Sequence, residues 1–322
     1  MEQLPQKINK AEHLAEMPAF FEHVRENVLN NFESRTEGLD IERINGFMRE
    51  RGLNSGDIIF FYDEDLPKLK ELFVFSDIGI FSESYPGKYF TELDIVLVRR
   101  DRESEKLNGS AISEGNAVHE MAHSANSFKE YTAVQQDVTR LRHGFTTKKI
   151  SQKSDGSPFL VKAEGQDPCA AWRGVFLEEA FAEMCRGEYL DAYILPETQE
   201  EIAELADMRM LTLRDKNEIS FGREKGKICR IGLKYASLTQ GDSISINIPS
   251  IGATALEKLC KKVPELRQCL MKARTDIESL REIPKLIEKV KPGLYGEIQK
   301  CGYSQDEFIR VQNIIKEAIQ SS

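Results

Sequence analysis

Apolar side chains in the first part of the chain follow the spacing that is typical of helices. Between residues 8 and 52 they recur every three or four positions and so line one face of a helix. Pro18 predicts a kink or a break, because proline removes a helical hydrogen bond. We therefore expect residues 1–55 to form an N-terminal helical segment.

The pattern changes at Gly56 to short apolar runs broken by proline and glycine. These runs are rich in Ile, Val, Phe and Tyr, as strands are. The predicted strands are 57–63, 72–76, 79–85 and 92–100. Residues 95–98 are all apolar, which indicates a strand covered on both faces.

Two further helices are predicted on either side of a hairpin. The first covers 112–125, with Ser110 as its N-cap. Residues 130–151 favour a β-hairpin that turns near His143 and Gly144. The second helix covers 171–193. We expect these elements to belong to one core, residues 56–195.

Helical spacing dominates the rest of the chain, residues 196–322. Residues 212–249 are mixed, with a strand at 244–248, and helices follow from 252. The predicted helix breaks are Pro264, Pro284 and Pro292. The predicted capping boxes are Thr198 with Glu201 and Ser304 with Glu307. An apolar seam is formed by Leu256, Leu259, Val263, Leu266 and Leu270, and we expect this subdomain to pack on the core.

Composition narrows the possible partners. The net charge of −9 argues against nucleic acid or an anionic membrane as the main partner. No stretch approaches the ~18 apolar residues of a membrane span. The N-terminal sequence lacks the uninterrupted apolar run of a signal peptide, so we expect a cytoplasmic location. The six cysteines contain no CxxC pair and are expected to be reduced and mostly buried.

The sequence His119-Glu120-Met121-Ala122-His123 carries the candidate chemistry. Residues four apart lie on one face of a helix, so the imidazoles of His119 and His123 can reach a single metal ion. Glu120 points away by roughly 100°. It is placed to contact a water on that ion, which is the general-base position of HExxH peptidases.

The residues around this motif indicate a buried helix. The flanking positions Ala117, Val118, Ser124 and Ala125 are uncharged, although 30% of the chain is charged. Two histidines and a glutamate in a buried helix need partners. The metzincin continuation HExxHxxGxxH is excluded, because Asn126 and Lys129 stand where it requires glycine and histidine.

The second helix supplies acidic candidates for a third ligand, namely Glu178, Glu179 and Glu183. Glu179 and Glu183 are four apart and share a face. Burying two carboxylates on one face is costly without a cation. With a metal ion present, one carboxylate can bind it, and the other can accept a hydrogen bond from the free ring nitrogen of a ligating histidine.

These two motifs resemble those of gluzincins, a branch of the zincin metallopeptidases that includes thermolysin. The matching stretches are HEMAH at 119–123 and EAFAE at 179–183. The resemblance implies one zinc ion held by His119, His123 and Glu179, with Glu120 as general base and Glu183 supporting a histidine ligand. It also implies an α+β, zincin-like fold, in which a small mixed sheet packs on the HExxH helix and a predominantly helical subdomain follows.

Several assignments stay open at this point. Glu178 competes with Glu179 as the third ligand, and Glu179 is favoured because only it has an acidic partner four residues on. The candidates for the donor that stabilises the oxyanion are Tyr131, His143, Arg173 and Tyr189. In zincins an edge strand before the motif helix pairs with extended substrate, and residues 92–100 hold that place.

The function favoured by this reading is zinc-dependent hydrolysis of peptide bonds in a peptide or protein substrate, by a water that the metal activates. One alternative is a non-catalytic binding or regulatory protein on a zincin scaffold. Another is a helical interaction protein in which the HExxH string is incidental. An intact Glu120 argues against a merely structural metal site, which does not need it.

Overall fold

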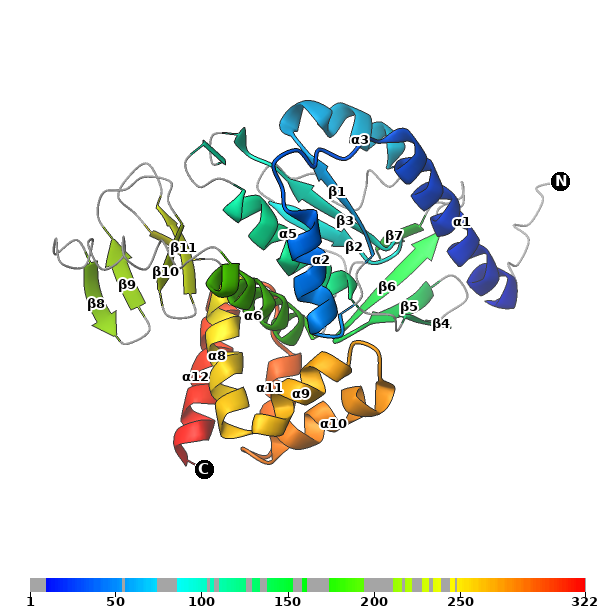
Figure 1. The fold of residues 1–322 in the computed structure, drawn as a ribbon. Coiled ribbons are helices and arrows are strands. Elements are labelled where there is room, and N and C mark those ends of the chain that lie inside the picture. Colours follow the sequence, from blue (N-terminus) through cyan, green and yellow to red (C-terminus); the bar gives the residue numbers. More distant parts are fainter. Residues whose placement is uncertain are drawn as a thin grey trace.

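The computed structural model describes most of the chain. The described residues are 10–53, 56–73, 86–102, 105–106, 110–125, 129–133, 138–152, 158–160, 174–193, 211–215, 218–221, 228–231, 234–238, 244–246 and 248–321. Helices predominate among them, and Figure 1 shows helices on both sides of a small sheet and a group of C-terminal helices apart from it. This arrangement is consistent with an α+β fold.

The N-terminal helices are α1 (Lys10–Asn31), α2 (Ile41–Glu50) and α3 (Leu66–Leu72). A mixed sheet is built from β1 (Asp57–Phe61), β2 (Gly87–Phe90) and β3 (Ile95–Arg99). Its strand order is β1-β3-β2, with β1 parallel and β2 antiparallel to β3. The central strand β3 is therefore paired along both of its edges.

Alternating side chains of this sheet enter two different cores. Phe60 and Val96 belong to the cluster that includes the side chains of α5 (Ala111–Ser124). Ile59 and Ile95 belong to a second cluster, together with α1 and α3. Successive residues of a strand face opposite sides, so the apolar run 95–98 is buried on both faces, as predicted.

A four-stranded antiparallel sheet follows α5. Its strands are β4 (Lys129–Ala133), β5 (Val138–His143), β6 (Thr146–Gln152) and β7 (Pro158–Leu160). The predicted hairpin turn is confirmed, because β5 and β6 are joined at Gly144 and Phe145. Gly144 has φ 54°, a left-handed conformation that glycine adopts without steric cost.

Helix α6 (Val175–Tyr193) packs against α5 and against the C-terminal helices. These are α8 (Ile248–Lys262), α9 (Pro264–Lys272), α10 (Ile277–Glu288), α11 (Leu294–Gln299) and α12 (Gln305–Ser321). One continuous cluster of buried side chains joins them to α2, the sheet and α5. The predicted apolar seam lies in this cluster, with Leu256, Leu259, Leu266 and Leu270 at 0% exposure.

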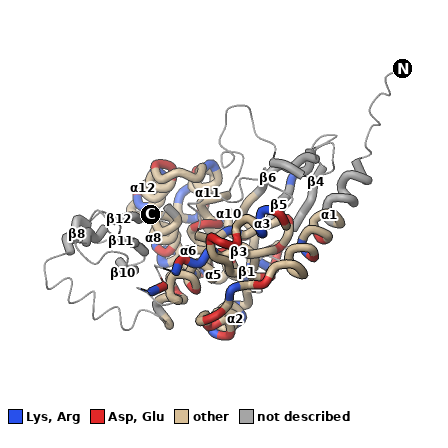
Figure 2. The backbone as a smooth tube through the Cα atoms, turned by 90° about the horizontal axis from the view of Figure 1, so that it is seen from above, with Lys and Arg blue, Asp and Glu red and all other residues tan. Residues whose placement is uncertain are grey.

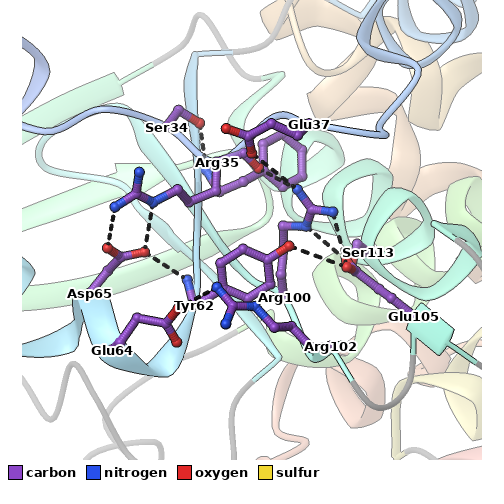
Figure 3. Close-up of polar contacts among 11 residues, drawn as sticks. Ser34, Arg35, Glu37, Tyr62, Glu64, Asp65, Arg100, Arg102, Glu105 and Ser113 are labelled. Carbon is purple, nitrogen blue, oxygen red and sulfur yellow. Dashed lines mark hydrogen bonds and ion pairs between the residues drawn. The ribbon is translucent and has the colours of Figure 1, made fainter.

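Polar contacts fix the start of α5 to the end of the sheet (Figure 3). Arg100, which follows β3, donates to Glu105 at 2.8 and 3.0 Å and to the backbone oxygen of Arg35 at 2.7 Å. Glu105 also accepts from Ser113 in the first turn of α5, at 2.7 Å. Asp65 holds Arg35 through two bonds, of 2.8 and 3.1 Å. The segment between α1 and α2, the sheet and α5 are thus held in one frame.

The break predicted at Pro284 is wrong, and of the kink or break predicted at Pro18 the break is excluded. Helix α1 runs through Pro18, and α10 contains Pro284 in its interior. Proline costs one helical hydrogen bond, but its φ is compatible with a helix. In α10 the burial of Ile283, Leu286 and Ile287 on either side of the proline offsets that cost. Pro264 does separate two helices, since α9 starts there.

The strand predictions need correction in three places. Leu72 ends α3 instead of starting a strand, and β2 was not predicted at all. The strand expected at 92–100 starts only at Ile95, because residues 91–94 form a turn in which Asp94 has φ 55°. That strand is also central, so it cannot be the edge strand that pairs with substrate.

The described part of 211–246 consists of five short strands. They are β8 (Leu211–Asp215), β9 (Glu218–Phe221), β10 (Ile228–Ile231), β11 (Lys234–Leu238) and β12 (Ile244–Ile246). Within the described residues after α6, the first helix is α8. The strand expected at 79–85 and the capping box of Thr198 and Glu201 lie outside the described residues. No helix in the described part combines the length and the apolar character of a membrane span.

Candidate metal centre

The metal-binding candidates lie where α5 and α6 face each other. Helix α5 carries His119 and His123, and α6 carries the three glutamates of the second motif. The two helices approach closely because Gly115 has no side chain. A Cβ there would lie 3.2 Å from Leu190 and 3.3 Å from Nε of Arg186, both on α6.

Three side-chain atoms converge between these helices. Nε2 of His119 lies 3.2 Å from Nε2 of His123. Oε2 of Glu179 lies 3.4 Å from the first nitrogen and 3.8 Å from the second. A point equidistant from the three atoms lies about 2.0 Å from each, which matches the Zn–N and Zn–O bond lengths of protein sites. The three predicted ligands thus fit one zinc ion.

The other ring nitrogen of each histidine faces a carboxylate of α6. Nδ1 of His119 lies 3.0 Å from Glu183, and Nδ1 of His123 lies 3.1 Å from Glu178. Ionised carboxylates can only accept, so each Nδ1 carries the hydrogen. In a neutral imidazole the lone pair then lies on Nε2. With both rings neutral, the two lone pairs and the Glu179 oxygen converge, and one cation at their centre would satisfy all three atoms.

The ionisation of these groups agrees with a cation at this centre. Burial alone would lower the pKa of His119, but the carboxylates of Glu179 and Glu183 outweigh it and raise the pKa to about 10. Burial would raise the pKa values of Glu178 and Glu183. Nearby arginines and histidines overcome this effect and lower both to about 2. The site therefore favours a bound positive charge.

Glu120 lies beside the edge strand β2. A Cβ on Gly87 would come within 2.7 Å of Cγ of Glu120, so the glycine leaves room for this side chain. The backbone of Tyr89 on β2 hydrogen-bonds to the Glu120 carboxylate. Burial raises the pKa of Glu120 above its ordinary value, against the attraction of His119 and His123. Glu120 is thus a partly buried base next to the three converging atoms.

The three converging side chains are mostly buried but keep a small exposure to solvent. The side chains of His119, His123 and Glu179 are 12%, 11% and 18% exposed. By contrast, Glu178 and Glu183 behind them are 5% and 2% exposed. The carboxylates behind the histidines are thus more deeply buried than the three converging side chains.

The structure bears on some of the alternatives that the sequence left open for the third ligand and the oxyanion donor, and not on others. Glu178, the alternative third ligand, faces Nδ1 of His123. It does not belong to the group formed by His119, His123 and Glu179, whose ligand atoms converge. The hydroxyl of Tyr189 donates to Glu114 and accepts from Arg43, so it is engaged by these two residues. Tyr131 and His143 are described only in their backbone, and Arg173 lies outside the described residues.

Three residues behind the site were missed in the sequence. Arg186 donates to Glu183 at 3.0 Å, and Ser250 donates to the same carboxylate at 2.9 Å. Arg274 donates to Glu178 at 2.6 Å. Arg186 was detectable, because it lies one helical turn after Glu183. Ser250 and Arg274 come from the C-terminal helices and have no local pattern that points to the site.

Comparisons with known proteins return nothing for this chain: no protein-family model, curated protein or solved structure gives a significant match. The function must therefore be argued from the geometry of the site.

Proposed function

We propose that this protein is a zinc-dependent metallopeptidase. The observation that carries the proposal is the convergence of Nε2 of His119, Nε2 of His123 and Oε2 of Glu179 on one point at zinc-ligand distance. Two imidazoles and one carboxylate leave a fourth zinc position open, as in catalytic sites. The carboxylates of Glu178 and Glu183 support the proposal, because ligating histidines usually donate their second ring hydrogen to such a group.

The chain's own residues supply the rest of the chemistry. When bound, zinc polarises a carbonyl oxygen and makes water more acidic. Glu120 takes the proton of the attacking water and then donates it to the leaving amine. Its raised pKa favours the first of these roles, since a more basic carboxylate takes the proton of water more readily. His119 and His123 keep their orientation throughout, because each Nδ1 remains bonded to a carboxylate.

Strand β2 is the proposed substrate-binding edge, in place of the strand expected from the sequence. Among the described strands it pairs only with β3 and so lies at an edge of this sheet, where an extended peptide would add as a further strand. Gly87 brings this edge close to Glu120. A peptide that adds a strand here would lie with its backbone beside the general base.

The proposal is tested by metal content and by peptide cleavage. Elemental analysis is expected to find about one zinc per chain, and His123→Ala is expected to reduce it. The parent protein should cleave casein or a peptide library. Glu120→Gln should cleave at least about a hundredfold more slowly while still binding zinc. Glu282→Gln, the same change at an exposed position of α10, is the matched control.

Three results would contradict the proposal. A Glu120→Gln variant that cleaves as fast as the parent would remove the enzymatic assignment. Zinc binding without any cleavage would favour a non-catalytic binding protein. Iron instead of zinc would indicate a different chemistry, because the same three ligand types also hold catalytic iron.

A further inference from the structure

The two carboxylates that hold the histidines are themselves held by the C-terminal helices. Ser250 in the first turn of α8 donates to Oε1 of Glu183 at 2.9 Å. Arg274, which follows α9, donates through NH1 to Oε1 of Glu178 at 2.6 Å. Each histidine is thus connected to the helices that begin at residue 248 by a chain of two hydrogen bonds.

The two hydrogen-bonded connections, one through Glu183 and one through Glu178, differ in how much they depend on these helices. Glu183 is also bonded by Arg186, which lies three residues further along α6 itself. The arginine that is bonded to Glu178 is Arg274, which lies 96 residues away in the sequence. The orientation of His123 therefore depends on long-range packing to a greater extent than that of His119.

Three donors fix the carboxylate of Glu178. Its Oε1 accepts from Arg274 and faces Nδ1 of His123 at 3.1 Å. Its Oε2 accepts from the backbone N–H of Phe145 at 3.1 Å. Contacts on both oxygens leave the carboxylate little freedom to rotate, so it presents a fixed acceptor to His123.

The surroundings of Arg274 are those of a buried charge and not of a surface side chain. It is 0% exposed, and its guanidinium carbon lies 4.6 Å from the ring centre of Phe145 and 4.2 Å from that of Phe181. An apolar side chain would fill this space with less desolvation. A buried ion pair is often no more stabilising than an apolar replacement, so its presence points to a role other than stability.

We propose that Arg274 is a positioning residue of the metal centre, which holds Glu178 so that His123 directs Nε2 at the zinc. The inference rests on the zinc site put forward above. It implies that docking of the α9–α10 turn on α6 completes the metal centre. The helices at the C-terminal end are then part of the site, although they supply none of the three proposed ligands.

The test is zinc affinity in the full-length protein, measured by competition with a chelator of known affinity. Arg274→Met is expected to weaken zinc binding about 10- to 100-fold, which is the usual effect of removing a residue that helps to orient a metal ligand. Arg281→Met removes an exposed arginine of α10 and should bind zinc as the parent does. Unfolding temperatures with and without zinc separate the two roles. A positioning role reduces the increase that zinc gives, whereas a merely structural role lowers both temperatures equally.

A double-mutant cycle tests whether Arg274 acts through Glu178. If it does, Arg274→Met combined with Glu178→Gln weakens zinc binding no more than the stronger single change. Additive losses would overturn the inference, and so would parent-like zinc affinity in Arg274→Met. If Arg274→Met does not fold, Arg274→Lys decides: a loss of threefold or more supports the inference, and unchanged affinity overturns it. A parent protein that binds no zinc would instead overturn the proposed function and this inference together.

Discussion

Charged side chains have opposite environments in two helical parts of this protein. Between α5 and α6, Glu183 and Arg186 are 2% and 7% exposed and form one buried network. On α10, the pair of Lys285 and Glu282 is 68% and 44% exposed. Figure 2 shows acidic and basic positions interspersed along α1, α2 and the C-terminal helices, where most of them face solvent.

The difference shows where charge has a function. An exposed pair costs little to form and contributes little, because water screens it. A buried pair loses the hydration of both ions and is retained when its geometry is needed. The buried network here surrounds the histidines, which is what a metal centre requires. The following predictions test this contrast, from the largest expected effect to the smallest.

Removing one member of the buried network should be the most damaging change. Glu183→Ala takes away the carboxylate that contacts His119, Arg186 and Ser250. We expect the free energy of unfolding in urea to fall by about 3–5 kcal/mol, the usual cost of breaking a buried ion pair. Glu282→Ala is the exposed control. A loss below about 1 kcal/mol for Glu183→Ala would remove the contrast between the two regions.

The metal-free protein should become less stable as the pH rises. The pKa of His119 is raised from 6.5 to about 10 in the folded state. Its proton therefore stabilises the fold fully below pH 6.5, and this contribution is lost as the pH approaches 10. In that window the free energy of unfolding should fall by about 1.4 kcal/mol per pH unit, measured by denaturation in the presence of a chelator.

Two histidine variants check the origin of this pH dependence. His119→Ala should flatten the profile, because the proton that is lost belongs to that ring. His23→Ala changes an exposed side chain of α1 and should leave the profile as it is. A parent profile that is flat between pH 6.5 and 9 would contradict the raised pKa.

Gly87→Ala should separate catalysis from metal binding. The added Cβ would lie 2.7 Å from Cγ of Glu120, so this side chain, the proposed general base, must move. We expect peptide cleavage to slow by about tenfold to a hundredfold, because a small displacement of a reacting group slows a reaction by that order. The zinc content should be unchanged. Gly46→Ala has open space around the new methyl group and should have no effect on cleavage. Loss of zinc in Gly87→Ala would instead indicate a wider disturbance of the site.

The smallest effect is expected on the surface of α10. Lys285→Ala removes an exposed pair with Glu282, whose N–O distance is 2.7 Å. The free energy of unfolding should change by less than about 0.5 kcal/mol, since exposed pairs contribute little. A loss above about 1 kcal/mol in urea denaturation would mean that these helices depend on surface charge.

The elements predicted well are those whose own pattern is strong. The helices at α5 and α6 and the turn at Gly144 lie where apolar spacing and glycine placed them. Strand β2 was missed because four residues, GKYF, carry too short a pattern. Pro284 gave a false break, because burial of its neighbours in α10 offsets the lost hydrogen bond. Local signals fail when tertiary packing outweighs them.

The chemistry of the site was predictable to the extent that it is local. The spacing of His119 and His123 requires both to face one side of α5, and the acidic run on α6 supplies the carboxylates. Spacing favoured Glu179 over Glu178, because only Glu179 has an acidic partner four residues on, but it did not show which atom Glu178 would contact. The two helices had to be packed together before one carboxylate reached Nε2 and the other Nδ1.

The sequence by itself determined the residue types of the centre and their order on two helices, because i to i+4 spacing follows from helix geometry alone. Tertiary structure decided that their atoms converge, that β2 and not β3 lies at an edge of the described sheet, and that Arg274 contacts the carboxylate behind His123. The physical reason is that these contacts join residues far apart in the chain. Their positions depend on how the buried side chains of several helices pack, and no local pattern encodes this.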